Sequence, residues 1–176
     1  MTPVLIIGYG NPLRSDDGIG WHAAQSLLNE WPADQVRVEA AHQLLPEMAA
    51  WIGDADCVIF IDAYWDAVPG RIRSHGVRPE KTMTASMTHH FSPQRLLANA
   101  RQLFYHAPDA VLVAVGGSSF EHGEALSPTV AAALPDLLTQ VKKIVRGALA
   151  KTAHGSSRQP DEFAKGIVAE KVESHA

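Results

Sequence analysis

Short apolar runs alternate with segments of helical periodicity along most of this chain. Residues 4–7, 58–61 and 110–115 contain only apolar residues, which predicts strands buried on both faces of a parallel sheet. Residues 35–39 alternate polar and apolar side chains, as a further strand would. Charged residues and glycine within residues 69–77 favour an edge strand. The apolar pattern therefore predicts about five strands.

Apolar residues recur at helical spacing in four segments between and after these strands. The spacing predicts helices over residues 18–28, 45–52, 92–104 and 127–145. Ser92-Pro93 and Ser127-Pro128 each provide an N-cap followed by a proline at the first helical position. Pro135 is expected to kink the last helix or to start a second segment. Alternating strands and helices predict an α/β fold, a three-layer α/β/α sandwich with a mostly parallel sheet.

The periodicity ends near residue 150. Residues 151–176 are rich in Lys, Ser, Gly, Gln, Glu and His, and this composition predicts a flexible C-terminal tail. A chain of 176 residues is long enough for one sizeable core but short for two domains. We therefore expect one α/β domain over residues 1–150.

Charge and composition exclude several classes of partner. A formal net charge of -4 disfavours binding to nucleic acid, which requires a basic surface. No apolar run approaches the ~20 residues that cross a bilayer, so membrane insertion is not expected. The lone cysteine, Cys57, cannot form an internal disulfide, and the N-terminus does not resemble a secretory signal. These features predict a cytoplasmic protein, which we expect to be a monomer.

Candidate chemistry follows the predicted strands, because open α/β sheets bind ligands beyond the carboxyl ends of their strands. Asp17 lies in the loop after the first strand, Asp62 ends the third, and His89 and His90 precede the helix over residues 92–104. Two carboxylates and an imidazole suit a divalent ion such as nickel or zinc and leave coordination positions open. A metal-free pair of carboxylates, in which one acid holds a proton and the other activates water, is the alternative.

We expect different roles for the two acids of the first loop, one structural and one chemical. Asp16 and Asp17 are adjacent, and we expect either Asp16 or Ser15 to cap the first helix, which leaves the other acid available. A dinucleotide fingerprint is a rival interpretation of the glycines in this loop. It is disfavoured because Leu13 replaces the third glycine and the two carboxylates would repel phosphate. Cys57 is expected to be a small core residue rather than a nucleophile.

Residues 8–20, GYGNPLRSDDGIG, resemble the opening motif G-x-G-N-x-L-x-x-D-[DE]-x-x-G of the hydrogenase maturation proteases. Later landmarks appear in the family's order: HQLLPEMA at 42–49, VIFIDA at 58–63, HHFSP at 89–93 and FEHGEALSP at 120–128. The resemblance extends to about residue 149. It implies a nickel-dependent endopeptidase that removes a short C-terminal extension from the large subunit of a nickel–iron hydrogenase after nickel insertion.

By motif matching, the resemblance implies that Asp17, Asp62 and His89 contact the metal, with His90 as the competing third ligand. Asp17 and Asp62 would also be the catalytic acids. The metal implied is nickel carried by the precursor of the hydrogenase large subunit, although other divalent ions could occupy such a site. Two further hypotheses stay open at this point, a non-catalytic chaperone of the nickel-loaded subunit and a nucleotide-binding α/β domain.

Overall fold

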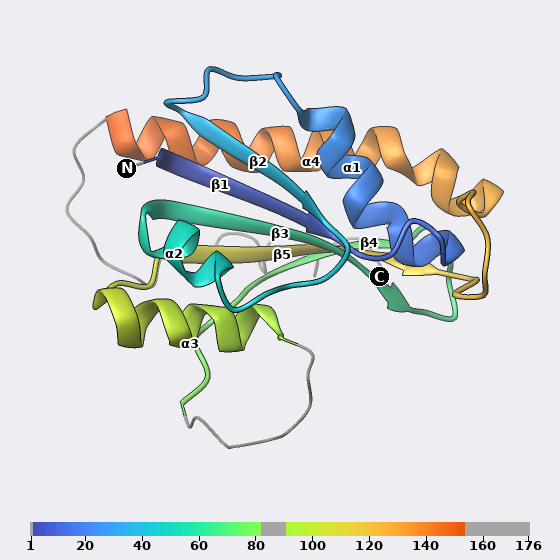
Figure 1. Ribbon diagram of the computed structural model, residues 1–176. Coiled ribbons are helices and arrows are strands. Elements are labelled where there is room, and N and C mark those ends of the chain that lie inside the picture. Colours follow the sequence, from blue (N-terminus) through green and yellow to red (C-terminus); the bar gives the residue numbers. More distant parts are fainter. Residues whose placement is uncertain (1, 82–90, 154–176) are drawn as a thin grey trace, which may run out of the picture.

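The computed structural model describes residues 2–81 and 91–153 and contains one five-stranded sheet (Figure 1). The strand order is β2-β1-β3-β5-β4. Four strands run parallel: β1 (Thr2–Tyr9), β2 (Val36–Ala41), β3 (Ala55–Trp65) and β5 (Asp109–Gly117). The fifth, β4 (Ile72–Gly76), is an antiparallel edge strand beside β5. The mostly parallel sheet predicted from the sequence is confirmed.

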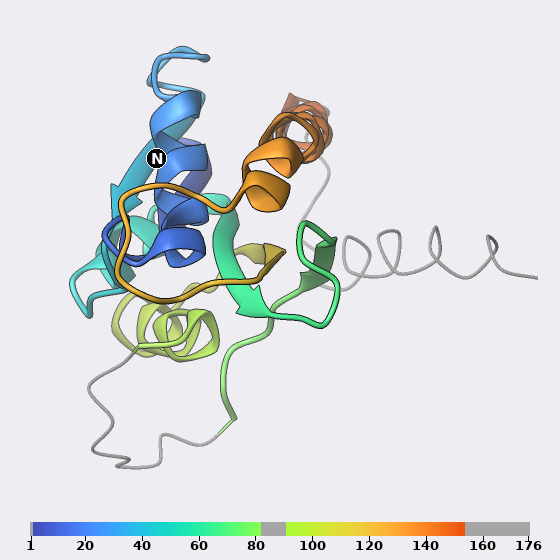
Figure 2. The same ribbon diagram turned by 90° about the vertical axis from the view of Figure 1, so that its right-hand side faces the viewer.

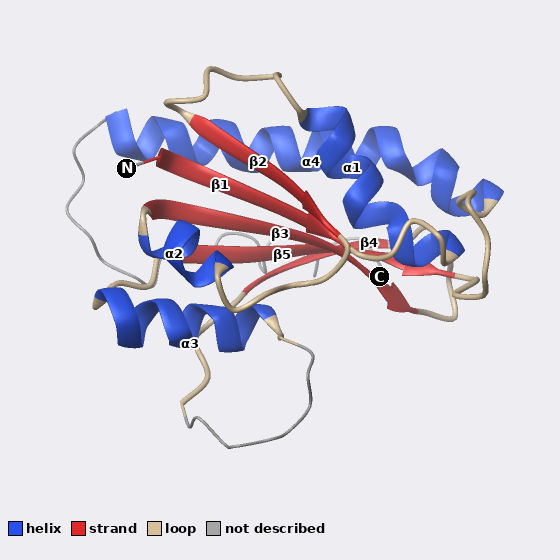
Figure 3. Ribbon diagram, viewed as in Figure 1, coloured by secondary structure: helices blue, strands red, loops and turns tan. Residues whose placement is uncertain are grey.

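Helices cover both faces of the sheet and complete three layers (Figures 2 and 3). Helices α1 (Ile19–Leu27) and α4 (Pro128–Ala153) lie on one face, and the short helix η1 (Ser15–Gly18) leads into α1. Helices α2 (Met48–Gly53) and α3 (Pro93–Phe104) lie on the other. No helix in the described part of the chain is long and apolar enough to span a membrane.

Each face of the sheet has its own apolar layer, because successive side chains of a strand point to opposite faces. Ile6 and Ile59 pack with α1 and α4, whereas Ile7 and Phe60 pack with α2 and α3. All four of these side chains are fully buried. This explains why the sequence shows unbroken apolar runs here rather than alternation.

Two elements run further than the pattern predicts. Strand β3 was expected to end at Asp62, but it stays paired with β5 as far as the Trp65–Gly117 pair. Ladder hydrogen bonds to β5 therefore extend the strand beyond Asp62 through residues 63–65. Helix α4 continues past Pro135 to Ala153, so of the two predicted alternatives, a kink or a new segment at Pro135, the new segment was wrong. The tail was predicted over residues 151–176, but residues 151–153 belong to helix α4, and residues 154–176 lie outside the described residues.

Candidate active site

Glycines in the first loop bring helix α1 directly against the strand ends. A Cβ atom on Gly20 would collide with the carbonyl oxygens of Tyr9 and Ile61, so only glycine lets the helix approach the ends of β1 and β3. Gly10 has a φ of +133°, and a Cβ atom there would collide with the carbonyl oxygen of Asp17. The close turn places Asp17 beside strand β3.

Asp16 is fully buried and ties this loop to a segment more than a hundred residues away. Its Oδ2 accepts hydrogen bonds from the backbone N–H of Ser118 at 2.8 Å and of Ser119 at 3.0 Å, and from the Ser118 hydroxyl at 3.1 Å. Its Oδ1 accepts the Ser127 N–H at 2.7 Å. Burial opposes ionisation, but these hydrogen bonds outweigh it and hold the pKa of Asp16 below its usual range.

The role predicted for Asp16 or Ser15 as a helix cap was wrong. Neither η1 nor α1 has a side-chain cap, and the Ser15 hydroxyl donates to the carbonyl of Glu121 instead. Both side chains bind the distant segment, which sequence spacing could not indicate. Asp16 is therefore the structural acid of the pair, and the availability of Asp17 stays a prediction.

Asp17 is partly buried and is held by the loop itself. Its Oδ2 accepts the backbone N–H of Asn11 at 2.9 Å, and the Asn11 side chain in turn accepts the N–H of Leu13 at 2.9 Å. This small network uses one oxygen of the carboxylate. The other oxygen, Oδ1, makes no hydrogen bond to the described residues in this network and is suited to a ligand or a water molecule.

Asp62 lies on β3 and, by strand alternation, projects from the same face as Phe60. Its Oδ1 accepts the N–H of Ala63 at 2.8 Å, and the Tyr9 hydroxyl donates to its carboxylate. Burial raises the pKa of Asp62 to about 6, with a further contribution from the negative charge of Asp17, against the lowering effect of the two hydrogen bonds. The two predicted acids are thus electrostatic neighbours.

Tyr9 is a site residue that sequence reasoning missed. Burial, and then the charge and hydrogen bond of Asp62, raise the pKa of its hydroxyl above the usual range, so it stays protonated and donates. It precedes Gly10 in the opening motif, and nothing in the local pattern indicates its partner. Only the parallel pairing of β1 with β3, which aligns Gly8 with Ile61, brings Tyr9 level with Asp62.

The predicted third ligand, His89, and its rival His90 lie outside the described residues. Phe91, which follows them, packs on the same face of the sheet from which Asp62 projects. Within residues 2–81 and 91–153, no three His, Cys, Asp or Glu side chains gather as a metal-binding group. The structure therefore brings together Asp17 and Asp62, and the histidine stays a prediction.

Cys57 is confirmed as a core residue rather than a nucleophile. Its side chain is buried, and burial raises the pKa of its thiol to about 12. A thiol that stays protonated at neutral pH is a poor nucleophile. Of the predicted site residues, Asp17 and Asp62 are the two that the described part of the chain brings close enough for the charge of one to act on the other.

The likeness of this chain to known proteins lies in its structure. The sequence matches no family model and no curated protein. The hydrogenase maturating endopeptidase HybD from E. coli superposes with a TM-score of 0.67 at 24% identity, over 84% of this chain and 94% of that one. The nickel–iron hydrogenase maturation protease HycI from Thermococcus kodakarensis KOD1 superposes with a TM-score of 0.65 at 21% identity, over 82% and 93%.

This chain has the fold of the hydrogenase maturation endopeptidases. A third example, the hydrogenase 2 maturation peptidase from Thaumarchaeota archaeon SCGC_AB-539-E09, gives a TM-score of 0.62 at 22% identity, over 82% of this chain and 98% of that one. The match covers nearly the full length of each of these endopeptidases.

Proposed function

We propose that this protein is an endopeptidase that removes the C-terminal extension of a nickel–iron hydrogenase large subunit after nickel has been inserted. The observation that carries the proposal is the pair of neighbouring acids, Asp17 and Asp62, at the carboxyl edge of a sheet with the endopeptidase fold. The opening motif over residues 8–20 supports the same conclusion independently. We further propose that the enzyme acts in the cytoplasm as a monomer.

The nickel ion belongs to the substrate in this mechanism. We propose that Asp17, Asp62 and His89 contact the nickel ion that the precursor presents. Carboxylates and imidazole accept a divalent ion of this kind, and the absence of a thiolate from the proposed set favours a transient contact over permanent binding. Asp62 must be ionised to serve as a ligand. Because its pKa is raised to about 6, proton competition should weaken this contact below about pH 6.

The same carboxylates are suited to peptide hydrolysis. A water molecule that attacks the scissile carbonyl must lose a proton, and the leaving amine must gain one. An acid whose pKa without a bound cation is about 6 accepts and returns a proton near neutral pH more readily than an ordinary aspartate does. We propose that Asp62 performs this transfer while Asp17, one of whose oxygens is held by Asn11, keeps the water in place.

The proposal is tested by incubating the purified protein with precursor from nickel-replete and nickel-starved cells, with and without chelator. Intact mass then reports removal of the extension. We expect cleavage of the nickel-loaded precursor only, and we expect free nickel added to apo precursor not to replace insertion fully. Equal cleavage of the nickel-free precursor would favour the metal-free acid pair. An unchanged mass together with stable binding of the precursor would favour the chaperone.

A further inference from the structure

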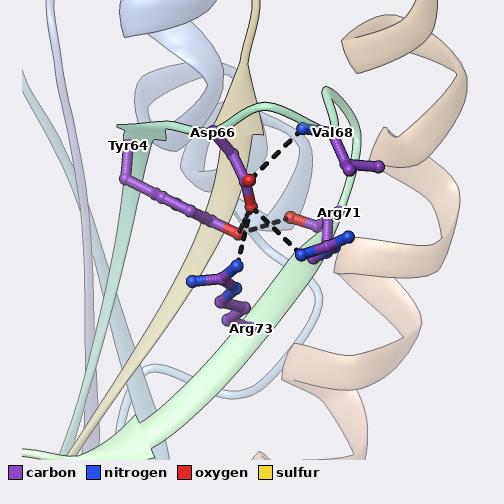
Figure 4. A network of polar contacts seen from close by, with 5 residues as sticks. All are labelled: Tyr64, Asp66, Val68, Arg71 and Arg73. Atoms are coloured by element: carbon purple, nitrogen blue, oxygen red, sulfur yellow. Dashed lines mark hydrogen bonds and ion pairs between the residues drawn. The ribbon is translucent and has the colours of Figure 1, made fainter.

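A compact polar network joins the end of β3, the start of β4 and the loop between them (Figure 4). Asp66 stands at its centre and accepts on Oδ2 from the Tyr64 hydroxyl at 2.7 Å and from Arg73 Nη2 at 3.0 Å. Arg71 Nη1 lies 3.8 Å from the same oxygen, and the Val68 N–H donates to Oδ1 at 3.2 Å. Two guanidinium groups therefore converge on one carboxylate.

Arg71 and Arg73 are both positively charged, and Asp66 neutralises only one of the two charges, so the network has one net positive charge. The Asp66 side chain is only 9% exposed, whereas those of Arg71 and Arg73 are 44% and 49% exposed. The guanidinium carbon of Arg73 lies 5.0 Å from the centre of the Tyr64 ring, a cation–π contact that helps to hold the group in position. Each ion pair uses one nitrogen of a group that has further N–H donors, so both arginines are oriented and accessible for a second anion.

Strand register places Arg73 in the same row as Asp62. Asp62 pairs with Ala114 of β5, and Ala114 pairs with Arg73 of β4. Directly paired residues project to the same face of a sheet, and neighbouring strands are about 4.8 Å apart, so the Cα atoms of Asp62 and Arg73 are separated by roughly 10 Å. The residue between them is an alanine, which projects little above the sheet.

We propose that Arg71 and Arg73 form a subsite that binds a carboxylate of the polypeptide substrate. This inference rests on the endopeptidase function proposed above. The carboxylate belongs to an Asp or Glu side chain of the C-terminal extension or to the chain terminus itself. A guanidinium matches the planar, two-oxygen geometry of a carboxylate better than it matches a neutral side chain. Because the Cα atoms of Asp62 and Arg73 are roughly 10 Å apart on one face of the sheet, the subsite lies within a few residues of extended chain from the acid pair.

The test compares Arg73→Gln with Arg37→Gln in the full-length protein, using nickel-loaded precursor as the probe. Arg37 is a matched control because it is also a partly exposed, ion-paired arginine, 2.7 Å from Glu39, but it lies on β2 at the opposite edge of the sheet. We expect Arg73→Gln to raise both the Kd for the precursor and KM on the order of tenfold, with kcat nearly unchanged. Arg37→Gln should change neither, and Arg73→Lys should recover part of the loss.

Two variant precursors distinguish the sources of the carboxylate. One has the acidic residues of the extension replaced by their amides, and the other has a Gly–Ser tail that moves the terminal carboxylate away. We expect one of the two to bind wild-type enzyme as weakly as native precursor binds Arg73→Gln, with no further loss when both changes are combined. Wild-type affinity for both variant precursors would overturn the subsite.

A purely structural role for the network gives a different pattern. Asp66→Asn removes the negative charge but keeps an oxygen that can accept from the guanidinium groups, so it should weaken precursor binding less than Arg73→Gln does. Equal losses in the two variants, or unchanged Kd and KM in Arg73→Gln, would overturn the proposal. If Arg73-dependent binding occurs without cleavage, the subsite stands and the endopeptidase function fails. A wild-type protein that neither binds nor cleaves the precursor would refute both.

Discussion

Replacing Asp62 by asparagine should abolish processing and at the same time stabilise the protein at neutral pH. The Asp62 side chain is partly buried and lies near Asp17. Burial, and to a smaller extent the charge of Asp17, disfavour its ionised form, so ionisation of Asp62 destabilises the folded protein. In the unfolded chain its pKa is the ordinary value of 3.8, and in the folded protein it is about 6. The folded state therefore binds more protons than the unfolded state between these two values, and stability falls as pH rises through that window.

The size of the effect follows from the difference between these two pKa values. A pKa difference of about two lowers the free energy of unfolding by roughly 3 kcal/mol above pH 6. This figure is an upper limit, because partial exposure of the side chain reduces the effect. Asparagine keeps an oxygen that can accept the Ala63 N–H, but it weakens charge-assisted hydrogen bonds by about 1 kcal/mol. We expect a net gain of about 1–2 kcal/mol near pH 7.5 and almost none near pH 4.

Thermal or urea unfolding at the two pH values measures this difference. For a domain of this size the gain corresponds to an increase in Tm of about 3–6 °C near pH 7.5. Asp66→Asn is the matched control with the opposite sign. The pKa of Asp66 is lowered, first by the Tyr64 hydroxyl, so that variant should lose stability at neutral pH. An Asp62→Asn protein that is less stable than wild type near pH 7.5, or equally shifted at both pH values, would refute the reasoning.

Four further variants test the structural acid, the two histidines and the tail. Asp16→Ala leaves the N–H groups of Ser118, Ser119 and Ser127 without their acceptor and should cost about 2–4 kcal/mol in a urea titration at pH 7. This loss should shrink as pH falls through the lowered pKa of Asp16; a constant loss would contradict its assignment as an ionised acceptor. His89→Ala should fold normally and lose processing, with a milder effect for His90→Ala, and the reverse order by intact-mass assay would reassign the ligand. Deleting residues 154–176 should leave Tm and cleavage nearly unchanged, and a drop in Tm as large as that of a core mutation would count against a dispensable tail.

Local signals in the sequence determined the elements of this fold. The buried strands are readable because a strand covered on both faces must be apolar at every position. The two Ser-Pro starts are confirmed: the Ser92 hydroxyl accepts the N–H of Arg95 at 3.2 Å, and that of Ser127 accepts the N–H of Val130 at 3.4 Å. Each of these caps joins residues only three positions apart, so it can be predicted from the local sequence without the tertiary structure. The two acids were found for a similar reason, because residues that follow parallel strands meet at one edge.

Only the tertiary structure determined the role of each polar residue at the carboxyl edge of the sheet. Asp16 and Asp17 are adjacent acids with the same local context, and only the packing of the segment that contains Ser118 and Ser127 makes the first structural and leaves the second available. The pairing of Tyr9 with Asp62 requires the parallel register of β1 and β3. The alignment of Arg73 with Asp62 requires both the parallel register of β3 with β5 and the antiparallel register of β5 with β4. Register depends on which strands pair. Strand pairing is determined by the burial of apolar side chains across the whole sheet, not by the residues next to each polar group in the sequence.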